Sequence, residues 1–253
     1  MKTPLCIALT VALFSAATAP APASAGTLLK VNGHILKWLP QSPGATTIIT
    51  YAVLKGPYTL PGGKRILSPD NCSSMHAFDG IVSSSPGIPA DMAERELRAA
   101  FAVWEAAANV TFVEVSDPLQ ANIVVGAQEF PAGRAFTNLS YLSSHGIQPV
   151  EKALGGPGPS AEAFDTEANG TVSGIEQSYV CLNPNMRWKT GFDGDLAVYD
   201  LRHTFTHEIG HAIGLDHPGS TGAIMAYRYD EHVQELQPSD IAAVQRLYGP
   251  PKQ

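Results

Sequence analysis

Three of the chain's eight histidines fall within the stretch HEIGHAIGLDHP, which begins at His207. His207 and His211 are four residues apart, so on a helix their imidazoles leave the same face one turn apart and can bind one metal ion. Glu208 projects about 100° away from His207, so its carboxylate can stand beside the ion without binding it. The spacing therefore indicates a metal site with a base next to it.

A third ligand requires the helix to end. Gly214 can supply that end, because glycine adopts the left-handed backbone conformation at little cost. The chain can then turn back and bring His217 to the ion. Three neutral imidazoles and one water form a tetrahedral zinc site with an open position. The alternative is a surface helix that carries histidines by chance, but the pattern H-E-x-x-H-x-x-G-x-x-H is much more specific than H-E-x-x-H alone.

This arrangement predicts hydrolysis of peptide bonds in a protein or peptide substrate by one catalytic Zn²⁺ ion. Zinc lowers the pKa of its bound water toward ~7 and polarises the scissile carbonyl. Glu208 is the expected catalytic residue, which takes a proton from the water and returns it to the departing amine. The expected metal ligands are His207, His211 and His217.

The elements that must position this site follow from the pattern of apolar residues. Leu97, Phe101 and Trp104 share one face of a helix expected at residues 90–109. Two more helices are expected, one over residues 199–215, which carries the histidines, and one over 239–248. Short runs of strand-forming residues predict strands at residues 47–54, 110–115, 121–126, 133–142 and 171–182. This order predicts one α+β domain with a mixed sheet.

The N-terminal part of the chain has a different composition. Residues 1–25 combine a basic start, an apolar run and an Ala-Ser-Ala cleavage site, which predicts a signal peptide and a secreted, extracellular protein. Residues 26–45 show no strong periodicity and are interpreted as a lead-in segment. The catalytic domain is then expected over residues 46–253. Within it, residues 55–89 are dense in Gly, Pro and Ser and are interpreted as a long loop or insertion.

The overall charge narrows the range of partners. The net charge of −7, without any basic run, argues against a nucleic-acid partner. After the first 25 residues no apolar stretch is long enough to span a membrane, so no membrane partner is expected. We expect a monomer.

Two cysteines remain once Cys6 leaves with the signal peptide. An even number in an exported chain predicts a disulfide between Cys72 and Cys181. The alternatives are two free thiols, or Cys72 as a metal ligand together with His76.

Sequence beyond the histidines resembles a known family. Met225 lies eight residues after His217, where metzincins have a methionine turn that forms an apolar floor beneath the ligands. The stretches ITYAVL, AAFAVWEAAANVTFVEV, ANIVVG and LQPSDIAAVQRLYG also resemble the matrixin branch of secreted metzincin peptidases. The resemblance covers roughly residues 46–249. It implies a twisted mixed five-stranded sheet, three main helices and an active-site helix that ends at Gly214.

The same resemblance locates the substrate. It implies an extended peptide along the edge strand near residues 133–140. It also implies a pocket just past the cleaved bond, lined by the helix at His207 and by residues after Met225, including Tyr227, Arg228 and Tyr229.

The chain departs from the matrixin pattern in three places. Residues 121–182 contain only His145, so the second, structural zinc of matrix metalloproteinases is not expected. The lead-in has no cysteine, so a cysteine-switch zymogen is not expected. Met225-Ala226-Tyr227 resembles the M-x-Y of astacins and serralysins, whose tyrosine can reach the zinc, while an ordinary pocket-wall tyrosine is the alternative.

Two weaker signals are left. Residues Asp165 to Glu176 have the spacing of a calcium-binding loop, although a polar hairpin turn at Asn169-Gly170 explains them more simply. His203 lies one turn before His207 and is expected to pack against or support the site and not to bind the ion.

Two functions from other classes fit parts of the sequence. One is a secreted zinc-binding or adhesive protein, against which Glu208 argues, because a structural metal site has no use for a base. The other is a zinc amidase with a non-protein substrate, whose cleft residues 55–89 would reshape.

Overall fold

The structure is a computed structural model that describes residues 26–62, 66–142, 148–149 and 171–252. The expected signal peptide, His145 and residues 165–170 of the calcium-like stretch lie outside these residues. In the part of the chain that is described, no helix has the length and apolar character needed to cross a bilayer.

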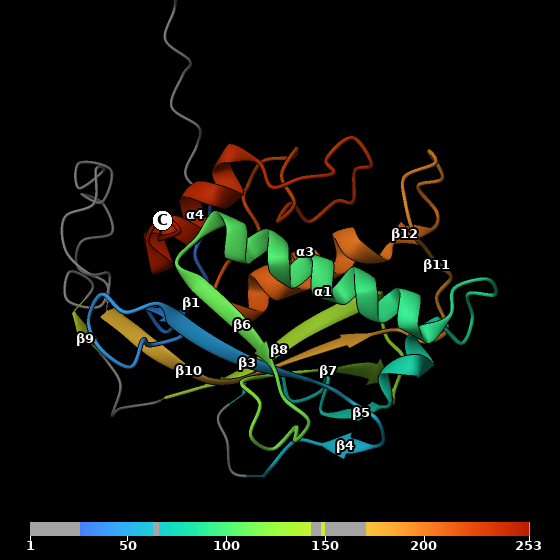
Figure 1. Cartoon of the computed structure of the whole chain (residues 1–253), viewed down its shortest axis with the longest axis horizontal. Coiled ribbons are helices and arrows are strands. Elements are labelled where there is room, and N and C mark those ends of the chain that lie inside the picture. Colours follow the sequence, from blue (N-terminus) through green and yellow to red (C-terminus); the bar gives the residue numbers. More distant parts are fainter. Residues whose placement is uncertain (1–25, 63–65, 143–147, 150–170, 253) are drawn as a thin grey trace, which may run out of the picture.

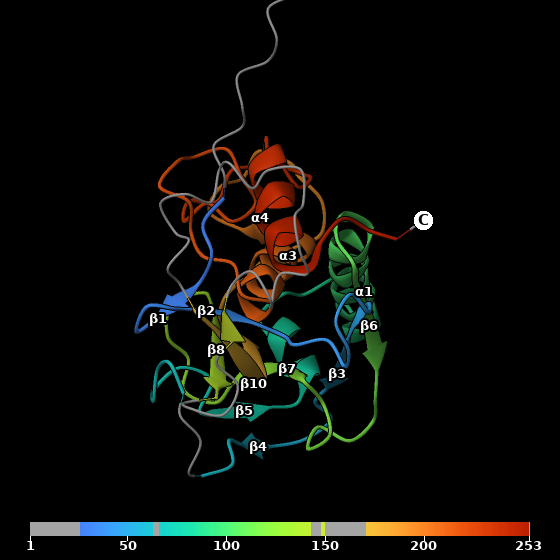
Figure 2. The same ribbon diagram turned by 90° about the vertical axis from the view of Figure 1, so that its left-hand side faces the viewer.

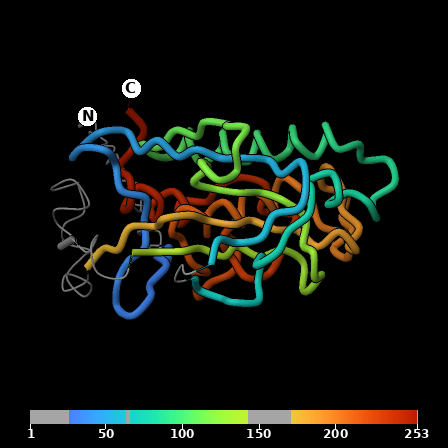
Figure 3. Tube along the Cα trace, turned by 90° about the horizontal axis from the view of Figure 1, so that it is seen from below, coloured from blue at the N-terminus to red at the C-terminus, as the bar shows by residue number. Residues whose placement is uncertain are grey.

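Five long strands form the centre of one twisted sheet (Figure 1). Their order is β8 (Ala135–Tyr141), β10 (Thr171–Leu182), β7 (Ile123–Gln128), β3 (Thr47–Val53) and β6 (Val110–Glu114). β8 is antiparallel to β10 and the other neighbours are parallel, which confirms the mixed five-stranded sheet. Figure 3 shows β10 along much of the molecule's length with β8 beside it.

Short strands extend this sheet in two regions where the sequence predicts none. The lead-in segment forms β1 (Lys30–Val31) and β2 (His34–Lys37), and β2 pairs in parallel with the first part of β10. Ile35 and Leu36 are both buried, so β2 shows no alternation of polar and apolar residues that would reveal a strand. The lead-in is thus part of the folded domain.

The described part of residues 55–89 also contains regular structure, which the interpretation as a long loop does not include. This part contains β4 (Tyr58–Thr59), β5 (Ser74–His76) and the 3₁₀ helix η1 (Phe78–Val82). The remaining short strands are β9 (Gln148–Pro149), which pairs with β10, and the separate pair β11 (Trp188–Lys189) and β12 (Tyr199–Asp200).

Three helices cover one face of the sheet, as Figures 1 and 2 show. They are α1 (Ala90–Ala107), α3 (Leu201–Ala212) and α4 (Pro238–Tyr248), which confirms the three expected helices. The main core lies between them and the sheet. Trp104 of α1 is fully buried, and its Nε1 donates a hydrogen bond to the main-chain oxygen of Thr206 at 2.9 Å, which fixes α1 against α3.

A second, smaller core lies around the disulfide. Cys72 and Cys181 are bonded, with Cα atoms 5.6 Å apart, so the expected disulfide is confirmed and its alternatives are not. Both cysteines are buried among Tyr58, Met75 and Tyr179. The bond therefore ties the segment before β5 to the last part of β10.

Helix α3 ends as expected near Gly214. The last residue of α3 is Ala212, and Gly214 has a φ of 98° in the left-handed region. A Cβ added to Gly214 would lie 2.2 Å from the main-chain oxygen of Leu36 in β2. Both the backbone conformation and the close approach of β2 therefore require glycine.

We expect the Gly214→Ala substitution to lower the free energy of unfolding by about 3 kcal/mol, since it combines left-handed strain with a clash against backbone. Urea unfolding of the purified chain measures this. Gly219→Ala is the matched control, because no atom of the described residues lies within 4 Å of its added Cβ. Equal stability of the two variants would contradict the requirement for glycine at Gly214.

Candidate metal centre

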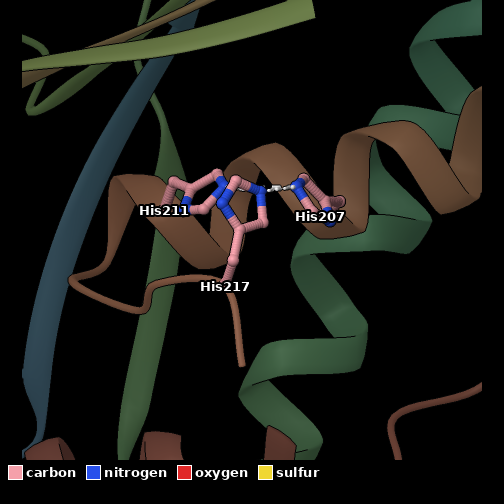
Figure 4. A group of neighbouring side chains, drawn as sticks. All are labelled: His207, His211 and His217. Carbon is pink, nitrogen blue, oxygen red and sulfur yellow. Dashed lines mark hydrogen bonds between the residues drawn. The ribbon is translucent and has the colours of Figure 1, made fainter. Parts of the chain in front are cut away.

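The structure brings the three histidines of the HEIGHAIGLDHP stretch together (Figure 4). His207 and His211 extend from α3, and His217 extends from the loop that follows Gly214. The Nε2 atom of His207 lies 3.1 Å from that of His211 and 3.1 Å from that of His217, and the third separation is 3.2 Å. The three side chains thus aim one nitrogen each at a common point.

In two of these rings the hydrogen bond made by Nδ1 determines whether Nε2 carries a proton. His207 Nδ1 lies 2.7 Å from the Ile224 oxygen, and His211 Nδ1 lies 2.9 Å from the Leu215 oxygen. A carbonyl oxygen only accepts hydrogen bonds, so each Nδ1 carries the proton and each Nε2 presents a lone pair. Burial lowers the pKa of all three histidines and favours their neutral forms. Converging lone pairs at this separation fit a cation that prefers imidazole ligands, such as Zn²⁺.

The methionine turn supports the cluster from below. Met225 is buried, and a Cβ added to Gly210, between the two helical histidines, would lie 2.2 Å from its sulfur. Asp240 of α4 accepts hydrogen bonds from the main-chain nitrogens of Ile224 and Met225 at 2.9 and 3.2 Å. Ile224 in turn accepts from His207, so α4 fixes the orientation of one imidazole through this turn.

The side chain of Glu208 extends from α3 to the edge strand β8. This side chain is buried, and its Oε2 lies 2.7 Å from the hydroxyl of Thr137. That hydroxyl is also 2.8 Å from the main-chain oxygen of Glu208, so it can donate to either atom. Burial raises the pKa of Glu208 to about 7, and the Thr137 hydrogen bond opposes this rise. Thr137 is not recognisable as part of the site from the sequence, because one hydroxyl within a predicted strand does not indicate such a contact.

A cleft of about 500 Å³ lies over the histidines and Glu208. Arg134, at the start of β8, stacks its guanidinium 4.2 Å from the Tyr199 ring at one end of the cleft. At the other end, the main-chain nitrogen of Leu67 donates to the Leu139 oxygen. The cleft therefore follows the outer edge of β8 past Glu208.

His203 and Tyr227 occupy different parts of this cleft. His203 lies outside the histidine cluster and packs edge-on against Tyr229, with ring centres 4.8 Å apart. It is buried, and its Nε2 has no hydrogen-bond partner in the part of the chain that the structure describes. Tyr227 is 77% exposed, and its ring lies edge-on to His217 at 5.3 Å, so it stands beside the third histidine at the cleft's opening.

Comparison with known protein families gives a match over most of the chain. The family model described as matrixin matches residues 78–249. Interstitial collagenase of Sus scrofa is 28% identical over 195 residues, which are 73% of this chain and 34% of that protein. Matrix metalloproteinase-19 of Homo sapiens is 31% identical over 178 residues, or 69% of this chain and 29% of the relative. Karilysin of Tannerella forsythia is 26% identical over 173 residues, which are 68% of this chain and 32% of that protein. The chain thus spans about a third of the length of these relatives.

His203 makes stability depend on pH in a predictable direction. Burial lowers its pKa to about 4, against 6.5 in an unfolded chain. Between these two pH values His203 is protonated in the unfolded chain but neutral in the folded chain. The contribution of neutral His203 to stability is therefore complete above pH 6.5 and is lost as the pH falls toward 4. When the pH falls from 7 to 5, we expect the free energy of unfolding to drop by about 2 kcal/mol more in the parent chain than in the His203→Leu variant. Urea unfolding at both pH values with saturating zinc measures this, and parallel losses in the two proteins would contradict it.

Proposed function

This chain belongs to the matrixin family of zinc metalloendopeptidases, and from that premise we propose that it is a secreted endopeptidase with one catalytic zinc ion. The proposed zinc ligands are His207, His211 and His217, and the proposed general base is Glu208. The expected signal peptide at residues 1–25 supports secretion.

One observation carries this proposal: three imidazole nitrogens, two of them fixed as unprotonated, converge beside a buried carboxylate at the edge of an open cleft. A structural zinc site is closed by four protein ligands, whereas a catalytic site keeps a position for water. Among the described residues, the clustered ligand atoms come from three histidines. Glu208 stands next to them without joining the cluster, as a base requires.

The residues of this chain divide the chemistry between them. A bound zinc ion supplies a Lewis acid that polarises a carbonyl and makes water more acidic. Glu208 then takes a proton from the attacking water and gives it to the leaving amine. Its pKa, raised by burial, suits a group that must both accept and release a proton near neutral pH. Thr137 donates to Oε2 of Glu208, so Oε1 is proposed as the atom that takes the proton.

The edge of β8 is suited to hold an extended peptide. The Arg134 oxygen accepts from Asn183 on the β10 side, and since strand residues alternate, the main-chain groups of Ala135 and Thr137 face outward. Among the described strands, only β10 pairs with β8 at these two residues. A substrate strand added there places a peptide bond beside Glu208.

The pocket for the residue just past the cleaved bond is proposed at the Arg134 end of the cleft. Tyr199, His203 and Tyr229 line it, and Arg134 lies over Tyr199. The carboxyl side of the substrate then lies at this end, and its amino side lies toward Leu139.

The Glu208→Gln variant tests the base. We expect it to keep its zinc and to lose about 10²- to 10⁴-fold in kcat, because the amide cannot accept the proton. Casein digestion and metal analysis of the same samples measure both, and a zinc chelator should abolish digestion by the parent chain. Glu129→Gln is the matched control, since Glu129 is exposed and lies outside the cleft. No digestion by the folded, zinc-loaded parent chain would contradict the proposed function.

Thr137 is a positioning residue in this proposal. We expect Thr137→Val, which removes the hydroxyl but keeps the shape, to lower kcat about tenfold with little change in KM or zinc content. Thr137→Ser should restore most of the rate because it restores the hydroxyl. If valine and serine variants are equally active, the hydroxyl does not position Glu208.

A further inference from the structure

Among the described residues, none pairs with the outer edge of β8 at Ala135 and Thr137, but this edge is occupied further along the strand. Ile66 forms an antiparallel bridge with Ser140, and the Leu67 nitrogen donates to the Leu139 oxygen at 3.1 Å. The segment at residues 66–71, which we call the capping segment, thus lies where the next part of a substrate strand would have to pair.

Asn138 completes this occupation with its side chain. Its Oδ1 accepts hydrogen bonds from the main-chain nitrogens of Ser68 and Leu139, at 3.1 and 3.0 Å. Its Nδ2 lies 2.6 Å from the Ser68 oxygen and 2.8 Å from the Asn71 oxygen. The side chain is fully buried. Both outward main-chain groups of Leu139 are therefore already bonded, its N–H to Asn138 and its oxygen to Leu67.

The disulfide anchors the capping segment from behind. Cys72 follows the segment directly and is bonded to Cys181, which lies opposite Phe136 in the β8–β10 ladder. The sulfur of Cys72 lies 3.3 Å from the main-chain oxygen of Phe136. The segment is thus held at both ends of the occupied stretch, by the bridge at Ser140 and by the covalent bond near Phe136.

We propose that the capping segment limits the amino side of the substrate to two residues before the cleaved bond. This inference rests on the proposed function, which places the reacting bond beside Glu208 and therefore beside Thr137. In this arrangement the residue just before the cleaved bond faces Thr137. The next outward position of β8 is Leu139, which in an antiparallel ladder faces the substrate residue two positions earlier, the third before the cleaved bond. Because Leu139 has no free main-chain group, the third residue before the cleaved bond gains no pairing.

The carboxyl side of the substrate meets no such limit at Ala135, where no described segment other than β10 pairs with β8. The side chain of Leu67 also borders the cleft and is 36% exposed, so the amino end of the peptide meets an apolar wall. The substrate class is therefore a peptide recognised mainly by residues after the cleaved bond.

A series of fluorogenic peptides tests this with the full secreted chain loaded with zinc. The carboxyl side is kept constant, and the amino side carries one to five residues before the cleaved bond, whose position is checked by mass spectrometry. We expect kcat/KM to rise from one to two residues and then to stay constant within about twofold. A rise of about tenfold on adding the third residue, the gain expected from two backbone hydrogen bonds, would overturn the inference.

The Asn138→Ala variant tests whether the capping segment causes this limit, because the substitution removes the hydrogen bonds that hold Ser68 and Asn71. Each variant is compared with its own rate on the two-residue peptide. We expect the third residue to increase kcat/KM several-fold in Asn138→Ala but not in the control Asn185→Ala, whose side chain is exposed and outside the cleft.

The double substitution Cys72→Ala and Cys181→Ala is the second variant, used if Asn138→Ala does not fold. It should give the same gain, because it releases the segment from β10. A folded variant without any gain would overturn the role of the segment. If the parent chain cleaves no peptide at all, the proposed function fails instead, so the two failures are distinguishable.

Discussion

The convergence of three imidazole nitrogens is the constraint on which the rest of the structure depends. Two of these nitrogens cannot carry a proton, since the opposite nitrogen of each ring donates to a main-chain oxygen. Neutral rings with lone pairs about 3 Å apart repel one another unless a cation lies between them. The surrounding elements must therefore hold the rings in place, and a bound ion repays part of that cost as folding free energy.

Support for the histidines comes from parts of the chain that are far apart in sequence. Asp240 of α4 holds the methionine turn, which orients His207. The first described residues hold the loop before His217, because Leu29 donates to the Gly214 oxygen and the Thr27 oxygen accepts from Asp216. The interpretation of residues 26–45 as a lead-in understates this role. These residues complete the sheet and brace the loop that carries the third histidine.

The sequence was sufficient for the features that depend on local patterns. The spacing of His207, His211 and His217 with Gly214 predicts the helix, its end and the convergence, and the long strands and helices lie within three residues of their expected limits. It was insufficient where side chains meet across long sequence separations. Thr137 and Asn138 contact Glu208 and Ser68, about 70 residues away in each case, and such contacts leave no periodic signal. The turn-rich residues 55–89 likewise gave no sign that a part of them pairs with β8.

X-ray absorption at the zinc edge of the purified chain reports the atoms around the metal without relying on activity. We expect one zinc ion per chain with three imidazole nitrogens and one oxygen at about 2.0 Å. We also expect His217→Ala to remove one imidazole from that shell. A sulfur atom or a fourth imidazole in the shell, or a shell unchanged in His217→Ala, would contradict a three-histidine site with an open position.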